Sequence, residues 1–353
     1  MSVLPIDILV VGAGPAGTAA ARAAAGRGLQ VLCIDRRAEI GLPVQCAEFV
    51  PMPLLRTVHE TASRVQDVEG MLTVLPSGLE QHSIFPGIMI DRGRFDQGLA
   101  DLARSAGAQV DTRTIFLSWD GQVATIKRNT GEIQKIEPRL LIAADGPHSP
   151  VAEALGLPHQ QVVYTRQYTV PLLHAYADTD IFLSDAFPGG YGWLFPRGPV
   201  ANLGLGADKR FEDNLKVPLE MLHQQMVDRG IVGPEVLGRT GGAIPVGGIR
   251  PMIHGNTILT GDAAGLTHPI TGAGIPAAVI SGDAAGIAAV DYLAGDAEAL
   301  ESYAEDMQDQ FGPALSRAVQ RRKSLEAVWH QPAAQDDRVM RSAWIAFDEY
   351  FAA

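Results

Sequence analysis

Apolar runs in this chain end repeatedly at glycine or aspartate, and the first such run predicts a strand, a tight turn, a helix and a second strand. Ile8–Val11 leads into Gly12, Gly14 and Gly17, an alanine-rich stretch follows, and a second apolar run ends at Asp35. Short apolar runs bounded by turn residues are typical of strands buried on both faces. The pattern therefore predicts a parallel strand–helix–strand unit at the start of the chain.

Further elements of the same kind follow at intervals. After Ile88–Ile90, the apolar residues Phe95, Leu99 and Leu102 recur every three to four positions, which predicts a strand followed by an amphipathic helix. Arg139–Ala144 predicts another strand that runs into a turn, and Ser149 precedes Pro150 as the expected N-cap of a short helix. Near the end of this series, a strand after Asn256 precedes an alanine-rich helix that is expected to open near Gly274.

Residues 160–250 have a different character, because four strand-like segments and one helical segment occur there without strand–helix alternation. We expect an antiparallel sheet backed by a helix, inserted as a substrate domain into an α/β Rossmann-like domain. The remainder, from Glu298 onward, predicts helices, with Gln320–Lys323 as a solvent-exposed face. The expected division is as follows: 1–75, 86–160 and 251–295 as the Rossmann-like domain, 76–85 and 161–250 as the substrate domain, and 296–353 as C-terminal helices.

Composition and charge narrow the classes of function. The net charge of −12 argues against a nucleic-acid partner, because phosphate backbones are bound by clustered Lys and Arg. The two cysteines, Cys33 and Cys46, provide neither a disulfide framework nor a CxxC metal site, and no metal is expected. No basic region precedes the first apolar stretch, which glycines interrupt after about six residues, so we expect no signal peptide, no membrane span and a cytoplasmic location.

The first glycine turn has the chemistry of a dinucleotide site. Gly12 permits the sharp turn, Gly14 lets a pyrophosphate approach the main chain, and Gly17 lets the helix pack closely on the strand. Asp35 follows Gly17 by 35 − 17 = 18 residues, near the offset expected for a carboxylate that binds ribose hydroxyls. Neighbouring residues are predicted to contact the same cofactor: Pro15, Ala16 and Arg36.

A second set of motifs lengthens this predicted site. Gly261 and Asp262 follow a later strand, and that carboxylate is suited to bind ribityl hydroxyls, while the start of the next helix offers main-chain amides to an anion or carbonyl. Asp145–Gly146 follows another strand, and Arg92 is a candidate for holding the pyrophosphate. The main-chain amides at the start of the helix that follows Gly261–Asp262 belong to Gly272, Ala273, Gly274 and Ile275. Two phosphate and polyol sites on one sheet favour a long cofactor, FAD rather than NAD.

The order of these motifs resembles that of FAD-dependent oxidoreductases of the hydroxylase-like flavoprotein group. Within that group the chain is similar to the geranylgeranyl reductase family. The residues that carry the resemblance are Pro43–Glu48 (PVQCAE), Pro188–Pro196, which fits the signature P-x-x-Y-x-W-x-F-P, and Asn256–Ile275 with GDAAG and TGAGI. The resemblance covers most of residues 5–290 and fades after that.

Alternate residues of a strand share a face, so Tyr191, Trp193 and Phe195 are expected to project together. They form either a wall of an apolar cavity against the flavin or an ordinary core stripe. The resemblance implies the first, with an isoprenoid chain in the cavity, and makes Tyr191 and Trp193 candidate catalytic residues.

The loop after Asp35 is the other candidate for chemistry. The resemblance implies that Cys46, Ala47 and Glu48 approach the isoalloxazine, with Cys46 near the reduced double bond, and it makes Cys46 and Glu48 candidate catalytic residues. A packed thiol is the alternative for Cys46. His268 is either a contact of the flavin ring or an ordinary loop histidine.

The resemblance implies an FAD-dependent reductase that passes electrons from an external donor, NADPH or another, through flavin N5 to a carbon–carbon double bond of a hydrophobic substrate. Two alternatives remain open at this point: a monooxygenase acting on a small molecule or a polypeptide, and an electron-carrying flavoprotein without a substrate pocket. No second GxGxxG unit for NADPH and no amphipathic membrane-binding helix are visible in the sequence.

Overall fold

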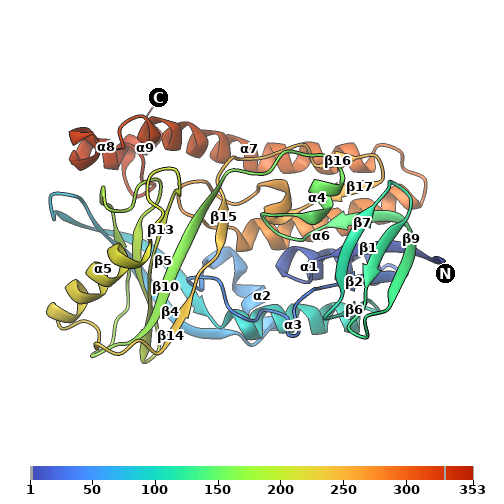
Figure 1. Cartoon of the computed structure of the whole chain (residues 1–353), viewed down its shortest axis with the longest axis horizontal. Coiled ribbons are helices and arrows are strands. Elements are labelled where there is room, and N and C mark those ends of the chain that lie inside the picture. Colours follow the sequence, from blue (N-terminus) through green and yellow to red (C-terminus); the bar gives the residue numbers. More distant parts are fainter. Residues whose placement is uncertain (1–2, 330, 353) are drawn as a thin grey trace.

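The computed structural model describes residues 3–329 and 331–352 and arranges them as two sheets with helices between and above them. In Figure 1 the sheets lie at opposite ends of the long axis, with α1 (Pro15–Ala25) and α6 (Ile275–Leu293) between them. Helix α7 (Ala299–Glu326) runs along one side of the molecule toward the second sheet, where the C-terminus lies.

The first sheet has eight strands and a parallel centre. Its order is β16-β17-β9-β1-β2-β6, and β8 and β7 extend it as antiparallel neighbours beside β9. The four neighbouring pairs from β17 to β6 are parallel. The strands are β1 (Val3–Val11), β2 (Val31–Ile34), β6 (Gln109–Asp111), β7 (Ile115–Trp119), β8 (Ala124–Lys127), β9 (Ile133–Ala143), β16 (Ile253–His254) and β17 (Thr257–Leu259). Burial on both faces explains the continuous apolar runs, and the α/β Rossmann-like fold is confirmed.

The second sheet has nine strands in the order β14-β10-β13-β12-β11-β4-β5-β3, with β15 beside β10. Neighbouring strands are antiparallel except for the parallel pair of β11 and β4. Leu219, Leu222 and Met226 of α5 (Lys216–Asp228) pack on one face. The strands are β3 (Phe49–Pro51), β4 (Arg64–Val74), β5 (Glu80–Ile90), β10 (Val162–Pro171), β11 (Thr179–Phe182), β12 (Gly192–Arg197), β13 (Val200–Ala207), β14 (Gly238–Thr240) and β15 (Ala243–Pro245).

The second sheet takes strands from sequence that the expected division gives to the Rossmann-like domain. β3 and β4 lie within residues 1–75, and the end of β5 lies beyond residue 85. The reason is that β4 and β5 are 11 residues each and form one long hairpin, to which β11 adds beside β4. The division into domains itself remains a prediction.

Small residues let the helices between the sheets approach each other closely. A Cβ at Gly282 of α6 would lie 2.1 Å from the carbonyl oxygen of Ala16, and one at Gly286 would lie 2.4 Å from that of Ala20. Helix α3 (Arg92–Ser105), which the sequence predicted, buries Phe95. Ser149 caps the start of α4, as predicted. The other helical elements are η1 (Met52–Leu54), α2 (Leu55–Glu60), α4 (Pro150–Ala154), η2 (Gly261–Ala264), η3 (Pro332–Gln335), α8 (Asp337–Ser342) and α9 (Asp348–Phe351).

Two further observations concern helix surfaces. None of the described helices is long and apolar enough to cross a lipid bilayer.

The predicted exposed face at Gln320–Lys323 is wrong for Arg322, which is buried. Its guanidinium meets Asp208, which lies 114 residues away in the chain, so the local charge pattern carried no sign of the pairing.

Candidate active site

The residues predicted to hold the cofactor gather at one edge of the first sheet. β17, β9, β1 and β2 are adjacent and parallel, so their carboxyl ends share that edge. Gly12 follows β1, Asp35 follows β2, Asp145 lies two residues beyond β9, and Gly261–Asp262 comes after β17. Open α/β sheets bind ligands in the crevice outside the carboxyl ends of their strands. The fold therefore brings four distant segments to one edge of the sheet.

The first glycine turn leaves space for a phosphate above Gly14. Gly12 has a φ of +100°, and a Cβ there would lie 2.3 Å from the carbonyl oxygen of Ala144. A Cβ at Gly17 would lie 1.8 Å from the carbonyl oxygen of Gly12, whereas a Cβ at Gly14 would meet nothing within 4 Å. Pro15 is the first residue of α1, whose N-terminal amides and dipole favour an anion. The turn fits a pyrophosphate.

Asp35 holds this turn in place. Its Oδ2 accepts a hydrogen bond from the Ala13 N–H at 2.9 Å, and its Oδ1 accepts one from the Arg37 N–H at 2.7 Å. Each carboxylate oxygen has two lone pairs, so capacity remains for ribose hydroxyls. The side chain of Arg36 is exposed beside it. The contacts of both residues with a cofactor remain predictions.

Two aspartates farther along the edge, Asp145 and Asp262, have largely buried carboxyl groups. Burial raises the pKa of Asp145 to about 6. Its Oδ2 accepts a hydrogen bond from the Val151 N–H at 2.9 Å, while its buried Oδ1 has no partner among residues 3–329 and 331–352. Burial also raises the pKa of Asp262, which accepts a hydrogen bond from the Thr267 hydroxyl at 2.5 Å. A buried carboxylate oxygen without a protein partner suits a ligand hydroxyl, so the polyol portion of FAD fits here.

The predicted start of α6 near Gly274 is confirmed. Gly274 is the N-cap of α6, which begins at Ile275, and Gly272 has a φ of +69°. The N–H of Gly272 donates to the carbonyl of His268, and the N–H of His268 donates to that of Ala273. The Ala273 N–H also donates to Thr271 Oγ1 at 3.3 Å, so two of the four predicted amides are bonded within the turn, and the contacts of all four with a cofactor remain predictions.

The Cys46 loop is joined to the signature strand through Gln167, a residue that the sequence did not single out. The Nε2 of Gln167 donates to the carbonyl of Cys46 at 3.1 Å, and its Oε1 accepts from the indole N–H of Trp193 at 3.0 Å. The Sγ of Cys46 accepts a hydrogen bond from the Glu48 N–H at 3.2 Å. The two predicted catalytic segments therefore share one hydrogen-bonded bridge.

Glu48 is buried and its carboxylate is surrounded by donors. Oε1 accepts from the Arg92 N–H at 2.9 Å, and Oε2 accepts from Asn202 Nδ2 at 2.9 Å and lies 3.0 Å from Arg197 Nε. These contacts join the start of α3 to the second sheet and favour a positioning role for Glu48. Its predicted catalytic role remains untested.

Arg92 faces a partner within its own helix. Its Nε and Nη2 form a bidentate pair with Asp96 at 2.9 and 2.8 Å. Burial opposes its charge, but Asp96 and the neighbouring Cys46 hold the pKa of Arg92 above its ordinary value. The guanidinium is thus fixed beside the Cys46 loop, and its contact with a pyrophosphate remains a prediction.

The aromatic residues of the signature strand share a face, as predicted. The rings of Tyr191 and Trp193 lie 5.7 Å apart, and Trp193 and Phe195 belong to one apolar cluster whereas Leu194 faces α5. The hydroxyl of Tyr191 donates to the carbonyl of Thr271 at 2.5 Å. The Cys46 loop, the signature strand and the turn before α6 therefore meet.

The end of the chain covers this aromatic face. We call residues 331–351 together with Trp329 the C-terminal cap. Trp344 packs on Tyr191 with ring centroids 4.9 Å apart, and the Tyr350 hydroxyl lies 3.3 Å from His268 Nε2. The space left beside Tyr191 and Trp344 is about 20 Å³. That is room for about one water molecule and not for a prenyl chain. The sequence signal for this cap is general, namely a concentration of aromatic residues near the end of the chain.

Comparison with known proteins decides the family. Residues 10–64 match the family described as an NAD(P)-binding Rossmann-like domain, and residues 51–186 match the FAD binding domain. The chain is 34% identical over 336 residues to the digeranylgeranylglycerophospholipid reductase of Methanocella arvoryzae, covering 88% of this chain and 85% of that one. The chain belongs to the geranylgeranyl reductase family.

Other members and solved structures agree with this. The digeranylgeranylglycerophospholipid reductase 2 of Methanopyrus kandleri is 31% identical over 347 residues, with 91% of this chain and 86% of that one covered. A geranylgeranyl bacteriochlorophyll reductase-like protein from Thermoplasma acidophilum superposes with a TM-score of 0.86 at 27% identity, covering 98% and 93% of the two chains. This member of the geranylgeranyl reductase family is an FAD-dependent oxidoreductase.

The fold is shared more widely than the family. A probable FAD-dependent monooxygenase from Pseudomonas aeruginosa has a TM-score of 0.70 at 17% identity, covering 96% of this chain and 99% of that one. At that identity the likeness shows the fold alone. Within the geranylgeranyl reductase family, the chemistry is therefore to be sought in the site rather than in the architecture.

The sequence left the role of His268 open, and the pH dependence of protein stability tests whether this side chain is buried and neutral. Burial lowers its pKa to about 4, and its Nδ1 accepts hydrogen bonds from the N–H groups of Thr271 and Ile270. A histidine in the unfolded chain has a pKa of about 6.5, so the contribution of the neutral His268 to the free energy of unfolding is complete above that pH. It falls as the pH drops from 6.5 toward 4, by on the order of 3 kcal/mol.

Denaturant unfolding across that pH range measures the effect. Other buried acids titrate there too, so the comparison is with a His268→Asn variant, whose amide oxygen can still accept a hydrogen bond. We expect the wild-type protein to lose more stability than the variant on acidification. Parallel pH curves for the two proteins would contradict a neutral, buried His268.

Proposed function

We propose that this chain reduces a carbon–carbon double bond of a hydrophobic, isoprenoid-like substrate, with FAD as its cofactor. The observation that carries the proposal is the meeting of three segments, namely the aromatic face of Tyr191 and Trp193, the Cys46 loop and the turn before α6. The names of the relatives as reductases of geranylgeranyl lipids support the same substrate class. Bound FAD supplies the hydride, and the protein supplies binding, orientation and exclusion of water.

Each group of residues has a separate task. The glycine turn at Gly12–Gly17 and the carboxylates at the strand ends hold the cofactor. Tyr191 donates to the Thr271 carbonyl and keeps its ring against the turn before α6. Double-bond reduction adds a hydride to one carbon and a proton to the other, and Cys46 is our candidate for the proton donor.

Access to the aromatic face depends on the C-terminal cap. Sites for small molecules usually span about 300–1,000 Å³, far more than the space of about 20 Å³ beside Tyr191. A prenyl chain can therefore lie against this face only when the cap has moved away from it. The rest of the substrate and an external electron donor, NADPH or another, would approach from outside.

The decisive experiment excludes oxygen. The FAD-loaded protein is reduced with dithionite under anaerobic conditions and then mixed with a dispersed geranylgeranyl lipid. We expect the yellow colour to return and mass spectrometry to show products heavier by pairs of hydrogen atoms. The fully saturated form of the same lipid is the control and should leave the protein reduced.

A different outcome would favour oxygen chemistry. If the reduced protein stays colourless with the prenyl lipid, and admission of air yields a substrate heavier by one oxygen atom, the reductase proposal fails. A monooxygenase acting on a small molecule or a polypeptide would then take its place.

A further inference from the structure

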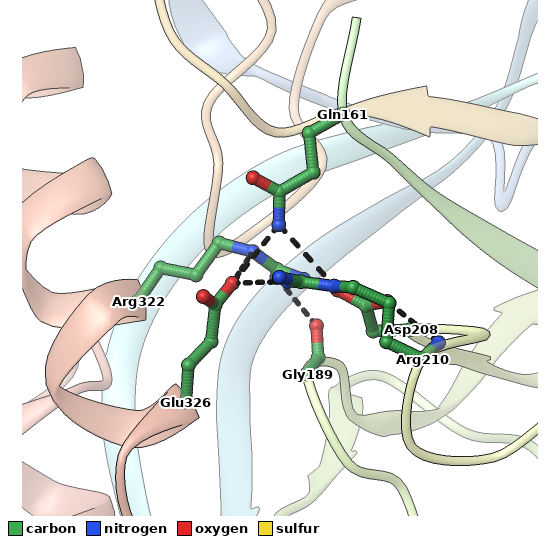
Figure 2. Close-up of polar contacts among 6 residues, drawn as sticks. All are labelled: Gln161, Gly189, Asp208, Arg210, Arg322 and Glu326. Carbon is green, nitrogen blue, oxygen red and sulfur yellow. Dashed lines mark hydrogen bonds and ion pairs between the residues drawn. The ribbon is translucent and has the colours of Figure 1, made fainter.

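A buried group of charges lies behind the loop that leads into the signature strand. Figure 2 shows Arg322 and Glu326 of α7 facing Asp208 and Arg210, with Gly189 below them. The Nη1 of Arg322 donates to the Gly189 carbonyl at 2.5 Å, and its Nη2 donates to Asp208 Oδ2 at 3.0 Å. Its Nε lies 3.3 Å from Glu326 Oε1. The side chain of Arg322 is only 5% exposed.

The charges in this group balance. Arg210 Nη2 lies 2.7 Å from both Asp208 Oδ2 and Glu326 Oε1, and Gln161 Nε2 donates to the same Glu326 oxygen at 3.0 Å. Burial raises the pKa of Asp208, but the hydrogen bonds from Arg210 outweigh it and hold that pKa at about 2. The group thus contains two basic and two acidic side chains in mutual contact, and each of the four has a partner of opposite charge.

The loop that this group holds has little freedom. Gly189 has a φ of +76°, and a Cβ there would lie 2.7 Å from the Asp208 Cβ. A Cβ at Gly190 would lie 2.0 Å from the Gly206 carbonyl oxygen, and the Asp208 N–H donates to the Pro188 carbonyl at 2.8 Å. The loop is pressed against the end of β13, and Tyr191 is the next residue.

We propose that Arg322 is a positioning residue for the reaction, acting through Gly189 to set the place of Tyr191 against the Thr271 turn. The inference rests on the proposed function, because Tyr191 borders the substrate site in that proposal. Arg322 lies outside the sequence motifs that suggested the family, and it is 133 residues away from Gly189 along the chain. A planar guanidinium can bind the Gly189 carbonyl and the Asp208 carboxylate at once, whereas an ammonium offers a single point charge.

Three single variants and one double variant test the proposal. Arg322→Met removes the donor, Arg322→Lys keeps the charge, and Lys323→Met removes an equal charge from the exposed neighbouring position on α7. Because Arg322→Met leaves Asp208 with fewer partners, the double variant Arg322→Met/Asp208→Asn is made as well to keep the charges balanced. The ratio of bound FAD to protein reports whether each variant is folded.

The first readout needs no substrate. The Gly190 N–H is bonded to the Phe187 carbonyl and the Gly206 N–H to that of Tyr191, so hydrogen exchange at these two amides reports on the loop. We expect exchange in Arg322→Met and in the double variant to be about tenfold faster than in the wild type. Arg322→Lys should be intermediate, and Lys323→Met should be unchanged.

The second readout is turnover with the prenyl lipid. We expect kcat per bound FAD to fall roughly tenfold in Arg322→Met and in the double variant, with KM changed much less, because misplacing a positioned group by about 1 Å costs rate. Wild-type exchange and kcat in the double variant would overturn the proposal, and so would losses that merely follow the loss of bound FAD. If the wild-type protein itself fails to reduce the lipid, the proposed function fails, while hydrogen exchange still tests the link between Arg322 and Tyr191.

Discussion

A Gly14→Ala variant is expected to fold as stably as the wild-type protein in the absence of cofactor and to lose most of its bound FAD. The backbone φ of −76° at Gly14 suits any residue, and a Cβ there would meet no heavy atom within 4 Å. The methyl group would instead occupy the space through which a pyrophosphate approaches the main chain. We expect affinity for FAD to fall on the order of 100-fold, which corresponds to about 3 kcal/mol.

The neighbouring glycine provides the contrast. A Cβ at Gly17 would lie 1.8 Å from the carbonyl oxygen of Gly12, so Gly17→Ala should disrupt the packing of α1 on β1 and lower the stability of the cofactor-free protein. Thermal unfolding without FAD and fluorescence titration with FAD separate the two effects. Wild-type affinity for FAD in Gly14→Ala would contradict the assignment of this turn to the pyrophosphate.

A Trp344→Ala variant is expected to lower the apparent KM for a prenyl lipid by about 10- to 100-fold. Trp344 is buried against Tyr191, and its indole N–H has no partner within the described part of the chain. Replacing a buried tryptophan by alanine is destabilising by about 3–5 kcal/mol. Here the change destabilises the closed position of the cap relative to an open one. If the substrate binds only when the cap is open, its apparent affinity is reduced by the fraction of protein in that state. Destabilising the closed cap therefore strengthens binding.

The control must destabilise the protein without touching the cap. Leu219→Ala on α5 meets this need, because Leu219 is fully buried on the opposite face of the second sheet. Both variants should unfold at lower denaturant concentration, and only Trp344→Ala should show the lower KM. An unchanged KM in Trp344→Ala would show that the substrate does not compete with the cap.

The cofactor site could be predicted from the sequence because its signals are local. Gly12–Gly17, Asp145–Gly146 and Gly261–Asp262 each stand directly after an apolar run, and parallel strands place their carboxyl ends at one edge. The same applies to Ser149 as a cap and to Gly274 at the start of α6. The long β4–β5 hairpin could not be predicted in this way, because its two strands pair across the expected division into domains.

The sequence by itself determined the parallel sheet, the glycine turn and the shared face of Tyr191, Trp193 and Phe195. These features follow from periods of two to four residues and from backbone sterics, which any short window contains. Only the tertiary structure decided which distant groups meet: Gln167 between Cys46 and Trp193, Arg322 beneath Gly189, and Trp344 over Tyr191. The physical reason is that a hydrogen bond or a ring contact depends on separation in space, and residues far apart in the chain leave no periodic trace of their pairing.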